Sequence, residues 1–514
     1  MDRNCGYVSD VEYPAGFFCE QSPAHLNFAC ILNGIEPIPL DRPFTYFELG
    51  FGQGLTSNIL AAGNPQGKFY AADINPVQVA SARKLAAAAC LENLTLFESS
   101  FAELAEGSVP DLPQFDFITM HGIYTWVVPE QRKHIVNFVD RYLKPGGIVF
   151  LGYNAMPGWA STLPLQRLML EHADQHPDRS DIQVQKAGRF VERLHDLKAS
   201  YFVDNPNLEH RLQTLKTLNP DYLAHEYMNR GWQPLYHADI ARDFGVAGLD
   251  YAGSADLPMA FPHLYLTPEQ RRLLDEIPDP VLRETATDFC RNTLFRRDIF
   301  VRDIRRMTQA RQSEWLQQLG LALTVLRDTA TTTMEVGIGI GAVSGRDDLY
   351  IPVLDALETG PKTLMELATL PQLRTQKLST LAEIAALLTA SGQASPFFLC
   401  SATMECESAR RMNQSIALHS LGSDSYQALA SPLLGSGVVA GLVQRLVYLA
   451  MCRESIDVNA IAMDAWKGML AKGGRVTKDG IPLESEEASI AELEVIVQAI
   501  LDRRVPIWRQ LKVL

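Results

Sequence analysis

The stretch FELGFGQG, residues 47–54, joins a short apolar run to a cluster of three glycines. The run TYFELG predicts a buried β-strand, and LTSNILAA after the glycines predicts a helix that ends at Gly63-Asn64-Pro65. A glycine-rich turn between a strand and a helix lets the backbone approach a ligand closely, because glycine has no side chain to obstruct it. The stretch therefore predicts a ligand site at the end of a strand.

The alternation of strands and helices continues to about residue 155. KFYAADI, LTLFES, FDFITMH and IVFLGYN predict four further strands, and VQVASARKLAAAACL and PEQRKHIVNFVDRYL predict helices between them. This rhythm predicts a parallel sheet covered by helices on both faces, an α/β fold. Ligands of such sheets bind at the carboxyl ends of the strands.

The spacing of the glycines narrows the kind of ligand. A dinucleotide fingerprint, GxGxxG/A, would need a small residue at position 55, but Leu55 stands there and Gly54 comes one position early. The pattern is instead ExGxGxG, with Glu48, Gly50, Gly52 and Gly54. Glu48 supplies a carboxylate that a nucleotide diphosphate would disfavour. A ligand with an α-amino group and a sulfonium would favour it.

A second carboxylate follows at the end of the next predicted strand. Asp73, with Ile74 beside it, lies 25 residues after Glu48. A carboxylate there can accept hydrogen bonds from both hydroxyls of a ribose, as in dinucleotide sites. The alternative is a helix N-cap, because Asp73 and Asn75 flank Pro76.

The third predicted strand closes on Ser99, Ser100 and Phe101. A hydroxyl and an aromatic face at this strand end would suit an adenine ring. Simple helix capping by the serines is the alternative. Ser100 and Phe101 are therefore candidate cofactor-binding residues.

Four segments together resemble the motif series of class I S-adenosylmethionine-dependent methyltransferases: ELGFGQG, AADIN, QFDFITMHGIYTWV and LKPGGIVFLGYN. The resemblance covers roughly the first third of the chain. It implies a Rossmann-like domain, S-adenosyl-L-methionine as the cofactor, and methyl transfer as the reaction.

A narrower resemblance extends further along the chain. EYPAGFFCEQSPAHLNFACILNGIEP is similar to the lead-in of rickettsial-type bacterial protein lysine methyltransferases, which carry a methyltransferase regulatory domain. LAHEYMNRGWQPLYHADI and FCRNTLFRRDIFVRD resemble that second domain, and ASPLLGSGV resembles the third. The resemblance implies that Tyr13 and Gln21 cover the cofactor and that a protein lysine accepts the methyl group. Two departures are Pro23, one position closer to Gln21 than in the family, and Phe51, where members usually carry Cys.

Candidate acceptor residues follow the fourth and fifth strands. MHGIYTWV brings His121, Tyr124 and Trp126 to the strand end where the acceptor should arrive, although the aromatic pair would equally cover the sheet edge. His121 is also expected to contact the cofactor. Tyr153 and Asn154 end the fifth strand and are candidates for positioning the acceptor by hydrogen bonds.

The segment His225-Glu226-Tyr227 offers a carboxylate and a phenol from a predicted helix. Glu226 would hold an incoming ammonium group or take its proton through water. A solvated helix glutamate is the alternative. None of the candidates forms a nucleophile–base pair, so covalent catalysis is not indicated.

Five regions are expected from the patterns. The first, 1–159, is the cofactor-binding core, and 160–234 is a helical insertion that serves as a lid or as the surface of a homodimer. AGLDYAGS and DIFVRD supply the sixth and seventh strands within 235–310. A linker helix and a winged-helix-like unit occupy 311–400, and 401–514 form a mostly helical domain with a hairpin turning at Asp479-Gly480.

Composition limits the partners. The formal net charge of −14 and a would-be recognition helix with only Lys377 as a cation argue against nucleic acid. No secretory signal or bilayer-spanning run is visible, and the eight scattered cysteines lack metal-ligand spacing. We therefore expect a cytoplasmic enzyme without a metal that methylates a protein lysine. The alternatives are a small-molecule N- or O-methyltransferase and a catalytically silent S-adenosylmethionine-binding adaptor.

Overall fold

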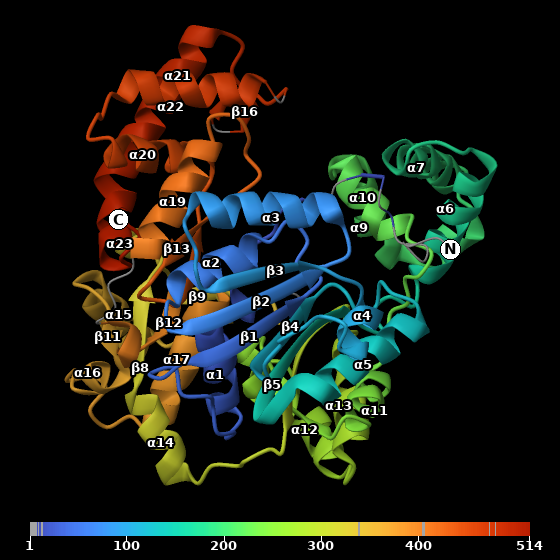
Figure 1. The fold of residues 1–514 in the computed structure, drawn as a ribbon, viewed down its shortest axis with the longest axis horizontal. Coiled ribbons are helices and arrows are strands. Elements are labelled where there is room, and N and C mark those ends of the chain that lie inside the picture. The colour runs from blue at the N-terminus through green and yellow to red at the C-terminus, as the bar shows by residue number, and fades with distance from the viewer. Residues whose placement is uncertain are drawn as a thin grey trace.

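The computed structural model describes residues 8, 10–11, 14–337, 340–402, 407–471, 473–478 and 480–514. Its centre is a seven-stranded sheet of order β3-β2-β1-β4-β5-β7-β6, with helices on both faces (Figure 1). The strands are β1 Phe44–Leu49, β2 Gly67–Asp73, β3 Leu94–Glu98, β4 Phe115–His121, β5 Leu143–Asn154, β6 Leu249–Ser254 and β7 Phe295–Arg302.

Strands β1 to β5 pair in parallel, and β7 runs antiparallel between β5 and β6. The predicted α/β fold is confirmed, including the sixth and seventh strands after a long intervening segment. Because the five parallel strands end at one edge, the glycine loop, Asp73, His121 and Asn154 lie along that edge. The helices that cover this sheet are α1 Pro23–Leu32, α2 Leu55–Gly63, α3 Pro76–Ala88, α4 Phe101–Glu106, α5 Pro129–Tyr142, α11 His237–Gly245, α12 Pro268–Asp275 and α13 Pro280–Arg291, with 3₁₀ turns η1 Cys19–Gln21, η3 Leu257–Ala260 and η4 Pro262–Leu264.

A helical lobe lies between β5 and β6 in the chain, where the insertion was expected. It has its own apolar core, which includes Leu165, Met169, Val184 and Tyr227. Figure 1 shows it standing apart from the sheet, at the upper right. Its elements are α6 Leu163–Gln175, α7 Ser180–Asp196, α8 Ser200–Val203, η2 Pro206–Leu208, α9 Glu209–Thr217 and α10 Pro220–Tyr227.

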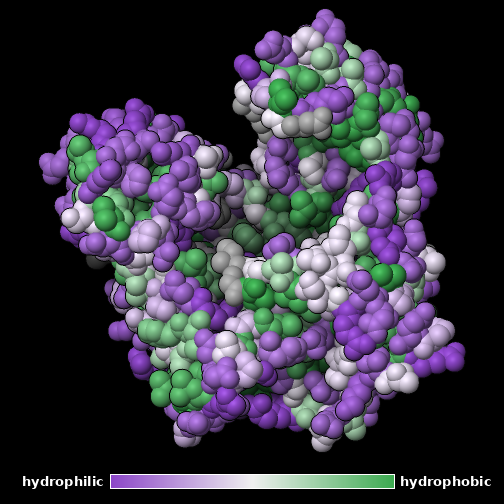
Figure 2. Space-filling model, turned by 180° about the vertical axis from the view of Figure 1, so that it is seen from behind, coloured by the Kyte–Doolittle hydropathy of each residue, from purple (hydrophilic) through white to green (hydrophobic). Residues whose placement is uncertain are grey.

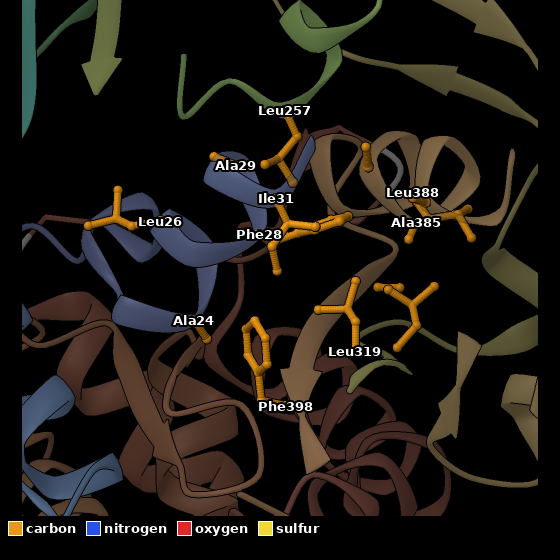
Figure 3. Close-up of a cluster of buried hydrophobic side chains, with 14 of the residues drawn as sticks. Ala24, Leu26, Phe28, Ala29, Ile31, Leu257, Leu319, Ala385, Leu388 and Phe398 are labelled. Carbon is orange, nitrogen blue, oxygen red and sulfur yellow. The ribbon is translucent and has the colours of Figure 1, made fainter. Parts of the chain in front are cut away.

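The middle region contains a three-stranded antiparallel sheet of order β11-β8-β12 together with helices α14 to α17. Its core is continuous with that of the first domain: Phe28 and Ile31 of α1 belong to one apolar cluster with Leu319, Leu388 and Phe398 (Figure 3). The winged-helix likeness remains a prediction. The elements are α14 Gln309–Gln317, β8 Leu319–Leu323, η5 Arg327–Thr329, β9 Thr333–Glu335, β10 Ala342–Ser344, α15 Asp347–Glu358, β11 Lys362–Thr363, α16 Leu364–Ala368, α17 Leu378–Ala390 and β12 Ala394–Phe398.

The C-terminal region is mostly helical, as predicted. It forms one of two lobes, the other being the insertion, on either side of a hollow whose floor is partly apolar (Figure 2). The expected hairpin is present as β15 paired with β16, although Asp479 of its turn lies outside the described residues. The elements are α18 Leu399–Ala402, α19 Glu407–His419, β13 Ala428–Ser431, β14 Ser436–Val439, α20 Leu442–Cys452, α21 Val458–Leu470, β15 Thr477–Lys478, β16 Ile481–Pro482, α22 Glu486–Ala499, a π-turn η6 Ile500–Arg504 and α23 Val505–Gln510. Within the described part of the chain, no helix combines the length and the apolar character that crossing a bilayer would need.

Candidate active site

The glycine loop joins β1 to α2 with a left-handed backbone at each glycine. The φ angles are +69° at Gly50, +58° at Gly52 and +73° at Gly54, which favour glycine. A Cβ at Gly50 would lie 2.4 Å from Ile123, and one at Gly54 would lie 2.6 Å from Ala82. At Gly52 it would meet nothing within 4 Å. The outer glycines are therefore required for packing, and Gly52 leaves open space in which a ligand can approach the backbone.

Asp73 connects this loop to the next strand. Its carboxylate accepts hydrogen bonds from the backbone amides of Gly52 and Asn75, both at 2.9 Å. The N-cap of α3 is Asn75, so the capping alternative does not describe Asp73. Burial raises the pKa of Asp73 to about 6, against hydrogen bonds from Asn75 and Gly52 that lower it. The carboxylate is thus fixed beside the open side of the loop, with Ile74 46% exposed next to it.

Glu48 lies deeper, at the end of β1. Its carboxylate accepts hydrogen bonds from Gln21 Nε2 at 3.2 Å and from the Ser57 hydroxyl. Burial raises the pKa of Glu48 to about 7, and the charge of Asp73 adds to this effect. Gln21 is fully buried, and its Oε1 has no hydrogen-bond partner among the described residues. An unsatisfied acceptor beside a buried carboxylate suits a cationic group, so these residues fit a ligand that carries an ammonium and a ribose.

Ser100 is the N-cap of α4 and forms a capping box with Glu103. The capping alternative therefore describes Ser100 in this structure. Phe101 follows it, half-buried against the core on that face of the sheet. Tyr13 lies outside the described residues, so its predicted contact with the cofactor stays a prediction.

His121 lies at the end of β4 beneath the N-terminal segment. Its ring stacks on Phe18 with centroids 3.9 Å apart, and a Cβ at Gly152 would lie 2.7 Å from its Nδ1. Burial lowers the pKa of His121 to about 4, so the ring is neutral at pH 7. Phe18 is held by its backbone amide, which donates to Thr56 Oγ1 on α2 at 3.1 Å. Sequence patterns did not identify Phe18, because nothing local pairs it with a strand about a hundred residues away.

Tyr124 and Tyr153 have partners within the fold, and their role in positioning an acceptor stays a prediction. Both are fully buried, and their hydroxyls donate to the carboxylates of Asp243 and Asp298, each at 2.8 Å. Successive side chains of a strand point to opposite faces, so Tyr153 turns into the core beneath the edge that carries Asn154.

A buried ionic network holds Tyr153 in that position. Arg296 binds Asp298 at 2.9 Å, Asp288 at 2.7 Å and Glu284 at 2.7 Å. His237 Nδ1 lies 3.0 Å from Asp298. The network ties α11 and α13 to β7 and stiffens the base of the predicted acceptor side.

Three tryptophan rings contact one another in a row that starts near the end of β4. Trp126 and Trp232 have ring centroids 5.8 Å apart, and Trp159 meets Trp232 edge-on at 5.0 Å. Trp126 Nε1 lies 4.0 Å from where a Cβ at Gly122 would stand, directly after β4. Neither Trp159 nor Trp232 was predicted as a site residue. Trp159 lies outside every motif recognised in the sequence, and the resemblance of the segment around Trp232 to the regulatory domain gave that residue no role.

Two amide groups lie buried near these segments. Asn154 Nδ2 and Asn229 Nδ2 have no hydrogen-bond partner among the described residues. The backbone carbonyl of Asn154 accepts from the amide of Leu235, which brings the chain after the insertion beside the end of β5. The predicted hydrogen-bonding role of Asn154 is therefore compatible with its surroundings.

Glu226 is half-buried on α10 and is not a freely solvated glutamate. Burial raises its pKa to about 7, whereas Arg211 and a hydrogen bond with Tyr222 lower it. Tyr227 is buried in the core of the insertion, 3% exposed. A carboxylate with a pKa of about 7 can take up a proton at neutral pH, so the surroundings of Glu226 are compatible with its predicted role.

Comparison with known proteins agrees with the fold. Residues 47–149 match the family described as "Methyltransferase domain", and residues 219–302 match "Predicted methyltransferase regulatory domain". The uncharacterized protein sll1526 of Synechocystis sp. is 35% identical over 512 residues, which are 99% of this chain and 99% of that protein. The uncharacterized protein RP028 of Rickettsia prowazekii is 26% identical over 220 residues, 43% of this chain and 86% of that protein.

Among solved structures, that of PKMT2 from Rickettsia typhi in complex with AdoHcy has the same fold. Its TM-score is 0.69 at 18% identity, covering 95% of this chain and 98% of that chain. The likeness therefore extends through the insertion, the middle region and the C-terminal region, well beyond the first sheet.

Proposed function

We propose that this chain, which belongs to the class I S-adenosylmethionine-dependent methyltransferases and to one family with Synechocystis sll1526, methylates lysine side chains of a protein. The proposal rests on two features. Glu226 of the insertion is half-buried, and the rings of Trp126, Trp232 and Trp159 form a row that starts near the end of β4. Aromatic faces and a carboxylate together favour a cationic acceptor side chain.

The cofactor side of the proposal rests on three groups of the chain. Gly52 offers its open backbone, Asp73 accepts the ribose hydroxyls, and Glu48 with Gln21 Oε1 receives the ammonium group. When bound, the cofactor supplies an electrophilic methyl group on a sulfonium. The neutral ring of His121 and the ring of Phe18 close the site from above and exclude water.

The acceptor side must remove a proton from the lysine. A free lysine ammonium has a pKa of about 10.4, and an apolar aromatic environment lowers it. Glu226, with a pKa raised to about 7, can take that proton directly or through water. The tryptophan faces then stabilise the methylammonium product.

The size of the molecule supports a protein acceptor over a small one. The hollow between the insertion and the C-terminal lobe offers more surface than a small acceptor needs (Figure 2). The Rickettsia typhi protein with the same fold over its whole length carries the name PKMT2, which agrees with this acceptor. We further propose that the enzyme works in the cytoplasm and that the insertion serves as a lid or as the surface of a homodimer.

Transfer of radiolabelled methyl groups into a cell extract tests the proposal. We expect labelled protein bands and methyl-lysine after hydrolysis. Asp73→Asn should bind the cofactor at least tenfold more weakly (about 1.4 kcal/mol). Glu226→Gln should keep cofactor affinity and lose about a hundredfold in protein labelling, whereas Glu171→Gln, an exposed glutamate of the same insertion, should label normally.

Three outcomes would contradict parts of the proposal. Label only in the low-mass fraction would identify a small-molecule acceptor. No label in any fraction, with cofactor binding intact, would indicate a binding protein. Full labelling by Glu226→Gln would remove the assigned base.

A further inference from the structure

Arg211 on α9 occupies an unusual position for an arginine. Its guanidinium carbon lies 3.9 Å from the ring centroid of Trp159, which is itself 5% exposed. Arg211 is half-buried, and its guanidinium forms no ion pair or hydrogen bond with any described residue. The stacking on Trp159 is therefore its one close contact with a side chain of complementary character in the part of the chain that the structure describes.

Two buried or partly buried arginines of β7 are bound much more tightly. Arg296 has three carboxylate partners, and Arg297 pairs with Asp256 at 2.8 Å and Glu20 at 3.3 Å. Partly buried guanidinium groups are normally held by such planar, paired hydrogen bonds. Arg211 lacks them, so the cation–π contact with Trp159 is what an incoming cation must replace.

Glu226 lies near this guanidinium without closing an ion pair. Arg211 is the first charged neighbour that acts on Glu226, and Tyr222 hydrogen-bonds to the carboxylate. No lysine, arginine or histidine of the described residues comes within salt-bridge distance of Glu226. The Arg211 cation thus stacks on a tryptophan face and acts through its charge on a half-buried carboxylate, and it is hydrogen-bonded to neither.

We propose that Trp159 and Glu226 form the binding site for the cationic side chain of the acceptor, and that Arg211 fills this site in the free enzyme until the acceptor displaces it. The inference rests on the proposed function, because it names the part of the protein acceptor that is recognised. Trp232 contacts Trp159 on one side and Trp126 on the other, so the site is continuous with the end of β4. An alkylammonium can replace the guanidinium on the indole face once the Arg211 side chain has rotated away. Neutral molecules lack the charge to do so.

Binding of n-butylammonium to the full-length protein tests this inference, with 1-pentanol as the neutral probe of similar length. We expect Arg211→Met to bind n-butylammonium about tenfold more tightly than the wild type by calorimetry, because the competing cation is gone. Binding of 1-pentanol should change far less. Adding Glu226→Gln to Arg211→Met should abolish the gain. Arg167→Met, an exposed arginine of α6 paired with Glu171, is the matched control and should bind like the wild type.

Equal n-butylammonium affinity in wild type and Arg211→Met would overturn the inference, as would an equal gain for 1-pentanol. Should Arg211→Met lose its native circular dichroism, Arg211→Gln gives the same comparison by the same criterion. The two proposals fail separately. If Arg211→Met binds n-butylammonium more tightly but the enzyme labels no lysine, only the assignment of lysine as the acceptor is contradicted. If lysine is labelled but Arg211→Met binds n-butylammonium like the wild type, only the displacement of Arg211 is contradicted.

Discussion

Gly52 and Gly54 share a left-handed backbone, but an added methyl group meets different surroundings at the two positions. Left-handed strain costs about 1–2 kcal/mol at either position. Gly54→Ala should lose about 1–3 kcal/mol more, because its Cβ would lie 2.6 Å from Ala82 on α3. Gly52→Ala should instead weaken S-adenosylmethionine binding at least tenfold, because its Cβ would fill the open side of the loop. Urea denaturation and calorimetric titration measure the two effects, and wild-type affinity in Gly52→Ala would exclude a ligand at that side.

The two acidic residues of the cofactor site predict a pH dependence. Burial raises the pKa of Glu48 to about 7 and that of Asp73 to about 6, above their ordinary values of 4.5 and 3.8. The folded free protein therefore binds more protons than the unfolded chain. The protonated carboxyls therefore add to the free energy of unfolding. This contribution is complete at a pH below the pKa values of the unfolded chain, and it is lost as the pH rises through the folded-state pKa values of about 6 and 7.

A cationic cofactor should compensate for this loss, because it binds the ionised carboxylates. We expect the increase in unfolding temperature caused by S-adenosylmethionine to be larger at about pH 8 than at about pH 5.5. Glu48→Gln should reduce the difference between the two conditions. Thermal unfolding by circular dichroism provides the measurement, and an increase that does not change with pH would contradict the role of these carboxylates.

Side-chain direction marks the limit of what the sequence could predict at this scale. The glycine spacing and the two acidic residues are local features of the sequence, and they were enough to predict the kind of ligand. Tyr124 and Tyr153 also lie next to strand ends, but each turns toward an aspartate that follows more than a hundred residues later. Such partners are set by the tertiary fold, so no spacing within a strand could reveal them.

At the scale of elements, α2 joins three parts of the chain. Thr56 binds the N-terminal segment through the amide of Phe18 and the carbonyl of Gly16. At the other end of the helix, Asn64 Nδ2 donates to the carbonyl of Gly435 at 2.8 Å, in the hairpin of β13 and β14. The helix that begins at the glycine loop is therefore fixed by the C-terminal domain as well as by the sheet.

Asn64→Ala should loosen that connection. Asn64 is 2% exposed, so its removal leaves the buried carbonyl of Gly435 unsatisfied, at a cost of about 1–3 kcal/mol. We expect faster amide exchange in residues 428–439 and weaker cofactor binding, because α2 loses one of its supports. Asn459→Ala removes an exposed hydrogen bond to Glu494 and should change neither quantity. Unchanged exchange in Asn64→Ala would show that the hairpin is held by apolar contacts alone.

The order of elements was more predictable than their tertiary contacts. Apolar runs and turn signals predicted all seven strands of the sheet, even across the insertion, because each strand is locally apolar and bounded. The contact of α2 with β14 has no local signal, since a Gly63 Cβ would lie 3.4 Å from the backbone of Ser436 more than three hundred and fifty residues away. This close packing of two backbones depends on Gly63 having no side chain, and a glycine alone does not reveal which segment will pack against it.

At the scale of the whole molecule, the domains share cores instead of meeting as separate bodies. Leu55, Ile59 and Ala62 of α2 lie in one apolar cluster with the C-terminal helices. Phe28 and Ile31 of α1 lie in another with Leu319 and Leu388 of the middle region (Figure 3). Composition and periodicity predicted five regions but not this continuity, because an apolar helix face does not specify which neighbour will cover it.

A shared core makes the middle region part of the stability of the cofactor site. Leu388 is fully buried on α17, and Leu388→Ala should cost about 2–5 kcal/mol. Because Leu388 belongs to the cluster that also contains Phe28 and Ile31 of α1, we expect one cooperative thermal transition at a lower temperature, without a separate unfolding step for the middle region. S-adenosylmethionine at about a hundred times its Kd should raise that same transition, by a stabilisation of about 2.7 kcal/mol. Leu418→Ala, an exposed leucine of α19, is the control and should unfold like the wild type. Differential scanning calorimetry with and without cofactor provides the measurement. Two transitions, of which the cofactor shifts only one, would show that the cofactor domain and the middle region unfold independently and do not share a core.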